Sequence, residues 1–436
     1  MTATMRFSRL RRRVAASIGL LFWMTLLFSG SPVSGLEIDH QWGGHLRGRG
    51  LVSRPDPNAV ILEKSAFADG AAELRLKSKV YLGDRWDAEA HYEAFLSGGD
   101  TRRNAKKMAA AFPGLAAQSG PPTDDHRLFD LTKTIDSDDS GILYHRLDRL
   151  SLTWLPDWGA VTLGRQALTW GNGLIFNPMD LFNPFRPTDF NRDYKTGDDM
   201  ALVRIRASTL GEFQFLGAPR RDPQSRDVEW DQSSVAGKFH FTRGTTEFDL
   251  MLARHYEDGV FGAGAMGYLF NAAWRADATW TLLDSESDRS GFLSVVANLD
   301  YSWVWKGKNF HGLIEGYYNG LGDDDYADTL ADPAVSDRLS RGEMFTLGQT
   351  YLAGQVRMEA HPLVNLYLLF FANVADPSGV AQPRVVWDIS QSLRCIAGAS
   401  LYFGGSGTEF GGFYLPKTNL EIAPSPQAFL WLTWFF

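Results

Sequence analysis

The sequence is nearly free of cysteine, since its 436 residues contain only Cys395. A single thiol excludes a disulfide framework and a cysteine metal site within the chain. No apolar run beyond the N-terminal region approaches the roughly 20 residues that a membrane-spanning helix needs. Positive charge is also in deficit, with 43 Lys and Arg against 51 Asp and Glu. The net charge of −8 argues against a nucleic-acid partner. We predict no cofactor and no metal.

The one long apolar run lies near the N terminus. It extends from Val14 to Phe28 and follows five arginines: Arg6, Arg9, Arg11, Arg12 and Arg13. Small residues come next, in Val33-Ser34-Gly35. This layout predicts a cleaved secretory signal peptide over residues 1–35, which leaves 36–436 as one domain. An uncleaved anchor helix is the alternative, although the run is short for one.

Strict alternation of apolar and polar residues dominates the rest of the chain. In residues 73–82 the even positions are mostly apolar and the odd ones mostly charged, and residues 85–97 repeat this pattern. Gly83-Asp84 joins the two runs as a tight hairpin. In a soluble sandwich the polar face meets water, whereas in a membrane barrel the apolar face meets lipid. The strand pattern alone does not separate these two folds.

The connections alternate between short and long, which is typical of bacterial barrels with periplasmic turns and longer outer loops. We predict an all-β fold, a transmembrane antiparallel up-and-down β-barrel of about 18 strands. Errors at 262–270 and near residue 392 would reduce the count to 16. An even count places both termini in the periplasm. The predicted strands are 39–52, 70–82, 85–97, 141–155, 159–170, 198–208, 211–219, 232–242, 245–256, 262–270, 273–282, 291–304, 309–319, 344–360, 363–374, 384–391, 393–404 and 426–436.

The final predicted strand carries a continuous apolar face made of Phe436, Trp434, Leu432 and Leu430. A soluble protein seldom leaves such an edge exposed, because it invites aggregation. Bacterial outer-membrane barrels end in this way, and their terminal aromatic is read by the barrel-assembly machinery. Together with the predicted signal peptide, this face favours a barrel in the cell outer membrane. We expect contacts with membrane lipid, lipopolysaccharide and the assembly machinery.

Charged residues gather on the predicted inner face of the barrel, where two interpretations stay open. In one, opposite charges on neighbouring strands pair and rigidify the wall. In the other, the first two strands form a basic wall that favours anionic solutes. The basic positions are His45, Arg47, Arg49, Arg75, Lys77, Lys79, Arg204, Arg206, Lys238 and His240. The acidic positions are Asp87, Glu89, Glu93, Asp249, Asp277, Asp300, Glu315 and Glu359.

Residues 171–197 form the most distinctive connection. Two Asn-Pro pairs set turns, and the apolar side chains around Phe176 and Phe182 need a surface to pack on. We predict that this loop folds inward and constricts the pore; an outer loop packed on its neighbours or on lipopolysaccharide is the alternative. Its charged residues near the constriction are Asp180, Arg186, Asp189, Arg192 and Lys195.

One predicted strand departs from the alternation. Val161, Leu163 and Arg165 share a parity, although the first two are apolar and the third is charged. Either Arg165 faces lipid near the rim of the barrel, or a β-bulge turns its side chain elsewhere.

Three motifs resemble bacterial porin-like barrels of the alginate-export type and their uncharacterised relatives. They are Leu163-Gly164-Arg165-Gln166, Trp170-Gly171-Asn172-Gly173 with the loop that follows, and Glu409-Phe410-Gly411. The resemblance implies an 18-stranded pore lined by arginines that passes an anionic polysaccharide.

The function that fits these patterns is a porin-like outer-membrane channel for small or anionic hydrophilic solutes. A barrel that assembles surface polysaccharide or mediates adhesion is one alternative. An outer-membrane enzyme is another, and His240 with Asp249 is a candidate pair for it, but no Gly-x-Ser-x-Gly motif occurs.

Overall fold

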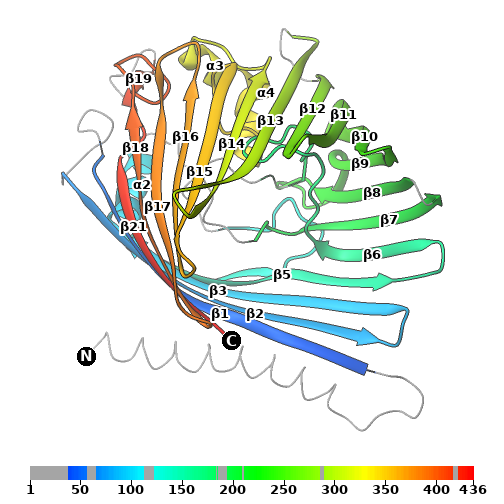
Figure 1. Ribbon diagram of the computed structural model, residues 1–436. Coiled ribbons are helices and arrows are strands. Elements are labelled where there is room, and N and C mark those ends of the chain that lie inside the picture. The colour runs from blue at the N-terminus through cyan, green and yellow to red at the C-terminus, as the bar shows by residue number, and fades with distance from the viewer. Residues whose placement is uncertain are drawn as a thin grey trace, which may run out of the picture.

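The protein forms a closed barrel in which the first strand lies beside the last (Figure 1). The structure, a computed structural model, describes residues 38–55, 65–111, 122–182, 184, 194–208, 211–284, 289–415 and 421–436. Eighteen antiparallel strands make up the wall, in chain order. They are β1 (Ile38–Ser53), β2 (Phe67–Leu82), β3 (Trp86–Gly99), β5 (Gly141–Trp154), β6 (Gly159–Gln166), β7 (Asp198–Ser208), β8 (Gly211–Arg221), β9 (Val228–Arg243), β10 (Thr246–His255), β11 (Asp258–Leu269), β12 (Ala272–Leu282), β13 (Gly291–Trp305), β14 (Lys308–Asn319), β15 (Thr350–His361), β16 (Val364–Asn373), β17 (Ser378–Ser390), β18 (Leu393–Phe403) and β21 (Gln427–Phe435).

The remaining described elements lie in the longer connections. These are α2 (Asp100–Ala111), β4 (Thr132–Ser137), α3 (Tyr326–Ala331), α4 (Pro333–Arg341), and the short pair β19 (Phe413–Tyr414) and β20 (Glu421–Ile422). In the described part of the chain, no helix has the length and apolar character needed to cross a membrane. The predicted signal peptide over residues 1–35 lies outside the described residues.

Alternation explains which face of each strand points outward. On β21 the side chains of Leu430, Leu432 and Trp434 are about half exposed on the outer face, whereas Trp431 and Thr433 between them are buried on the inner face. The same parity governs β1, where Arg47 is buried and Leu46 is exposed. A period of two therefore gives the barrel an apolar outside and a polar inside, as transmembrane barrels require.

The predicted count of 18 strands is confirmed, including the uncertain strand β11 and the turn at residues 391–392. Several boundaries differ from the prediction; β9 and β11, for example, each begin four residues earlier than expected, at Val228 and Asp258. The strand expected at 344–360 begins at Thr350, because residues 344–349 belong to a loop that enters the barrel. The strand expected at 384–391 begins earlier, at Ser378, and β6 ends at Gln166 rather than residue 170.

Residues 122–137, which we call the rim segment, complete the wall where β6 and β7 stop short. One edge of β5 pairs with β3. Along the other edge, residues 142–146 of β5 pair with β4, and residues 150–154 pair with β6. The backbone of Arg127 then forms an isolated antiparallel β-bridge with Arg220 of β8. The chain between β3 and β5 thus closes a gap that the short strand β6 leaves open.

Candidate functional site

A basic cavity of about 600 Å³ lies inside the barrel, and we call it the vestibule. Its size is within the range of small-molecule sites. It is bounded by β1, β2, β3 and β5, by the rim segment and by the two inward loops described below. Among the described lining residues, eight are cationic and only Glu73 and Glu93 are carboxylates. The cationic residues are Arg47, Arg49, Arg75, Arg102, Arg127, Arg146, Lys195 and Arg341.

Part of the predicted basic wall is paired with carboxylates. Arg49 forms an ion pair with Glu73, which also contacts His45 at 3.0 Å. Arg75 pairs with Glu93 at 3.1 Å and with Asp148 of β5. Wall pairing, the first of the two interpretations, therefore describes Arg49 and Arg75.

The lysines of β2 contact aromatic rings instead. The ammonium group of Lys77 lies 3.9 Å from the ring centroid of Tyr194 and is hydrogen-bonded to its hydroxyl group. The guanidinium group of Arg75 lies 4.4 Å from the same centroid, and His45 stacks on the ring at 5.8 Å. Lys79 lies 5.0 Å from the ring of Tyr81. The ring contacts hold the ammonium groups of Lys77 and Lys79 in place without neutralising them, whereas Arg75 is also paired with carboxylates.

The other predicted wall residues take less part in the vestibule. Glu93 lines it and binds Arg146 at 2.9 Å, but Glu89 contacts His91 and, like Asp87, lies further along β3. On β7, Leu202 packs inside the barrel. Arg204 and Arg206 share its parity and lie beyond it, toward the end of β7 that pairs with the start of β8.

The described part of the loop 171–197 folds into the barrel. Trp170, Met179 and Phe182 pack against inner side chains of β7 to β11. Phe176 stacks on Tyr317 at a centroid distance of 4.4 Å and packs against Phe371. The predicted inward course of this loop is therefore present in the structure, and the apolar side chains that indicated it are buried against the inner wall.

Two charged residues of this loop form a buried ion pair, in which the ammonium group of Lys195 contacts the carboxylate of Asp180. Burial raises the pKa of Asp180 to about 6 and lowers the pKa of Lys195, because both charged forms are desolvated. The other predicted charges of the constriction, Arg186, Asp189 and Arg192, lie outside the described residues.

A second loop, between β14 and β15, also enters the barrel and was not predicted to do so. It contains α4, which begins with the N-cap Asp332 and Pro333 and ends at Gly342 in a left-handed conformation. After the helix, Glu343 contacts His255 at 3.0 Å. Arg341 at the end of α4 lines the vestibule. Side chains in a loop do not alternate between two faces as they do in a strand, so the sequence pattern gave no sign that Arg341 would line the vestibule.

Arg146 was missed for a different reason. The register of β3 against β5 shifts between His91 and Tyr92, so that Asp148 is an extra residue in β5. Such a bulge reverses which parity faces inward. It places Arg146 and Asp148 on the inner side, and a strict alternation cannot reveal that.

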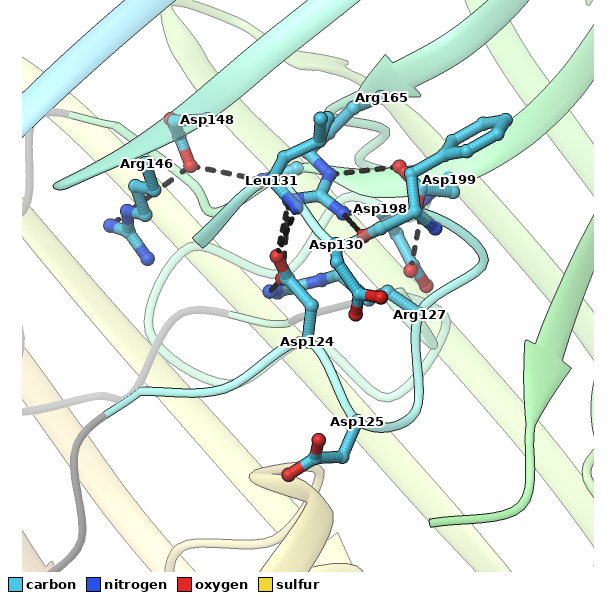
Figure 2. Close-up of polar contacts among 12 residues, drawn as sticks. Asp124, Asp125, Arg127, Asp130, Leu131, Arg146, Asp148, Arg165, Asp198 and Asp199 are labelled. Carbon is cyan, nitrogen blue, oxygen red and sulfur yellow. Dashed lines mark hydrogen bonds and ion pairs between the residues drawn. The ribbon is translucent and has the colours of Figure 1, made fainter. Parts of the chain in front are cut away.

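Arg165 is fully buried at the base of the rim segment and does not face lipid (Figure 2). Its guanidinium group binds both carboxylate oxygens of Asp199, at 2.8 and 2.9 Å, and binds Asp124 at 3.1 Å. The preceding residue, Gly164, has a φ of +113°, and a Cβ there would lie 2.2 Å from a carbonyl oxygen of Leu150. A glycine is therefore required next to Arg165.

Asp124 links this buried group to the vestibule. Burial raises its pKa, but the hydrogen bond from Arg127 and the charge of Arg165 outweigh that effect, so the pKa of Asp124 lies below its usual value. Asp124 accepts a hydrogen bond from Arg127 at 2.7 Å, and Arg127 lines the vestibule. Arg165 thereby holds the rim segment and, through it, one of the vestibule cations.

We expect Arg165→Met to loosen the rim segment while the barrel stays folded. Breaking a buried ion pair by removing one partner costs about 3–5 kcal/mol. Hydrogen exchange of residues 122–137 should therefore accelerate strongly, with little change in β10 to β16. Arg206→Met serves as the control, because Arg206 lies outside this network. Unchanged exchange in the rim segment would show that Arg165 is not its anchor.

The closed barrel of eighteen strands, with inward loops, has the fold of outer-membrane porins. Three solved structures are similar to it. They are OccAB3 of Acinetobacter baumannii (TM-score 0.53, 8% identity, 91% of this chain and 99% of that chain), OccK5 (OpdH) of Pseudomonas aeruginosa (0.52, 9%, 91% and 98%) and a BenF-like porin from Pseudomonas fluorescens Pf-5 (0.51, 12%, 91% and 98%).

At these identities the likeness establishes the fold alone. No protein-family model matches the sequence, and no curated protein matches it. The expected resemblance to alginate-export-type barrels is not supported, because the structural matches are Occ and BenF-like porins. The motifs that suggested it have local roles here: Gly164 and Arg165 attach the rim segment, and Trp170 packs the inward loop against the wall.

Proposed function

We propose that this protein is an outer-membrane channel that passes small anionic hydrophilic solutes through the vestibule, with the loop 171–197 narrowing the passage. The outer apolar faces of the strands meet membrane lipid and lipopolysaccharide. A barrel of this strand number has room for water inside, whereas one of eight strands is filled by side chains. The porin fold of the similar structures supports this role.

One observation carries the proposal: cationic side chains from separate elements converge on one cavity. Arg47 comes from β1, Arg146 from β5, Arg127 from the rim segment and Arg341 from α4. Arginine suits oxyanions, because its planar group donates to two oxygens at once. Fixed charge of one sign in a confined, low-dielectric space raises the local concentration of counter-ions. Five of the eight cations are paired with carboxylates: Arg49, Arg75, Arg127, Arg146 and Lys195. We expect the excess of cations that remains to favour anions although the whole chain is acidic.

Replacing Arg47, Arg49 and Arg75 together by Gln should shift ion selectivity toward cations. These side chains line the vestibule, and salt screens their fields less in a confined space than on an open surface. Reversal potentials across a KCl gradient measure the shift, and the wild type should prefer chloride. Lys238→Gln is a suitable control, because Lys238 pairs with Asp249 at 3.1 Å and does not line the vestibule. A cation-selective wild type that the triple substitution leaves unchanged would refute the proposal.

An enzymatic role has little support from the polar clusters. His240 contacts Asp249 at 3.0 Å, and Lys238 completes a wall ion pair with the same carboxylate. Ser234, His255 and Glu343 follow one another in hydrogen-bond contact, each at 3.0 Å. However, the Ser234 side chain is buried and its oxygen also accepts a hydrogen bond from Arg220. Its burial and the hydrogen bond from Arg220 fit a structural role for the Ser234 hydroxyl group.

A further inference from the structure

Two carboxylates on the inner wall contact the backbone of the inward loop. Asp277 projects from β12 and Glu315 from β14, and their exposed fractions are 1% and 0%. Asp277 accepts hydrogen bonds from the backbone N–H groups of Asn172 and Gly173, at 2.5 and 3.2 Å. Glu315 accepts from those of Leu174, Ile175 and Phe176, at 2.8, 3.0 and 2.7 Å. Five successive N–H groups thus converge on two carboxylates.

The remaining partners of these carboxylates are also neutral amides. Asp277 accepts from the side chain of Asn172 at 2.8 Å, and Glu315 accepts from that of Asn298 at 3.0 Å. Among the hydrogen bonds of the described residues, these two carboxylates thus receive only amide N–H groups. Buried charge is costly unless it is paired or fully hydrogen-bonded, so the loop backbone provides most of the compensation here. A concave run of successive N–H groups is a recognised way to bind an anion.

The loop sequence is suited to this geometry. A Cβ at Gly173 would lie 1.8 Å from the carbonyl oxygen of Phe176, so the tight path of the backbone requires glycine. Phe176, the last donor of the run, then packs against Tyr317 and Phe371. The segment Gly171-Asn172-Gly173 thus presents its N–H groups to the wall, and the aromatic contact fixes the end of the run.

We infer that Asp277 and Glu315 are positioning residues of the channel, which set its aperture by holding the loop 171–182 against the wall. This inference rests on the proposed function. If the loop detaches, water in the interior rehydrates both carboxylates, so that the wall itself does not depend on the contact. The same two groups would thereby decide how much of the interior the loop fills, without touching the solute.

Single-channel conductance of the full-length mature protein in planar bilayers tests the inference. The double variant Asp277→Asn/Glu315→Gln keeps the side-chain size but removes both negative charges that the loop N–H groups stabilise. In Glu315→Gln the new amide also turns N–H donors toward a backbone N–H group whichever way it lies, because both carboxylate oxygens of Glu315 accept from the loop backbone. Gly173→Ala disturbs the same contact from the side of the loop. We expect both variants to insert and be heat-modifiable like the wild type. We also expect their conductance to rise severalfold, toward that of a protein lacking residues 174–194.

Asp300→Asn is the matched control. Asp300 is an inner-wall carboxylate of β13, between β12 and β14, but its partners are Arg275 and His311 rather than the loop. This variant should conduct like the wild type. Wild-type conductance in both the double variant and Gly173→Ala, with a large increase on loop deletion, would overturn the inference and leave the proposed function standing. Failure of both the wild type and the loop-deleted protein to conduct would overturn the proposed function itself.

Discussion

Replacing Phe436 by Asp is expected to leave most of the protein uninserted and degraded in the periplasm. The ring of Phe436 lies on the seam between β1 and β21, where it contacts Trp42 and Trp434. It covers Gly44, at which a Cβ would lie 2.9 Å from the ring, and the Phe436 carbonyl accepts a hydrogen bond from the Gly44 N–H at 2.9 Å. A carboxylate there places charge on the outer apolar face at the strand pair that closes the barrel.

Phe436→Tyr is the control, because it keeps the ring and adds only a hydroxyl group near the membrane interface. Together with Trp434 and Leu432, Phe436 forms the face that we predict the assembly machinery to read. Heat-modifiable, membrane-inserted protein measured by gel shift separates the two variants. Normal amounts of inserted Phe436→Asp protein would mean that neither the seam nor the predicted assembly signal depends on this side chain.

Deleting residues 174–194 is expected to raise single-channel conductance severalfold, the largest functional change that we foresee. The described part of this loop fills the interior with bulky side chains, among them Phe176 and Phe182, which are buried against the inner wall. The deletion also removes Tyr194, whose ring is enclosed by Arg75, Lys77 and His45. A wider and more hydrated passage should conduct more and select less.

Recordings of the deletion protein at several salt concentrations separate these two effects, because fixed charge matters most at low salt. The deletion protein should keep the residual anion preference that Arg47 and Arg146 confer. Conductance equal to that of the wild type would place the limiting constriction elsewhere, for example at the α4 loop, where Arg341 lines the vestibule.

The alternation of apolar and polar residues was sufficient to predict the wall strands, because each strand has one apolar outer face and one polar inner face. The strand expected at 273–282 is observed at Ala272–Leu282, and the one expected at 393–404 at Leu393–Phe403. The basic positions on β1 and β2 followed from the same rule, and Arg47, Arg49 and Arg75 do line the vestibule. A period of two thus predicts both the fold and the faces of its regular strands.

The rest of the site depends on contacts that no period encodes. The extra residue Asp148 in β5 changes the parity of Arg146, and the rim segment is joined to β8 by Arg127. The α4 loop places Arg341 in the vestibule through tertiary packing. The sequence also did not reveal which cationic residues of the wall are paired with carboxylates. Arg75 on β2, for example, forms an ion pair with Asp148 on β5, although the neighbour of β2 on that side is β3.

Single-channel recording of the purified wild-type protein tests the central claim most directly, namely that a continuous aqueous passage remains beside the inward loops. We expect discrete current steps whose size grows with the KCl concentration, and a reversal potential that favours chloride. Inserted wild-type protein that gives no current steps, while the variant lacking residues 174–194 conducts, would contradict the claim and show a barrel that its loops keep closed.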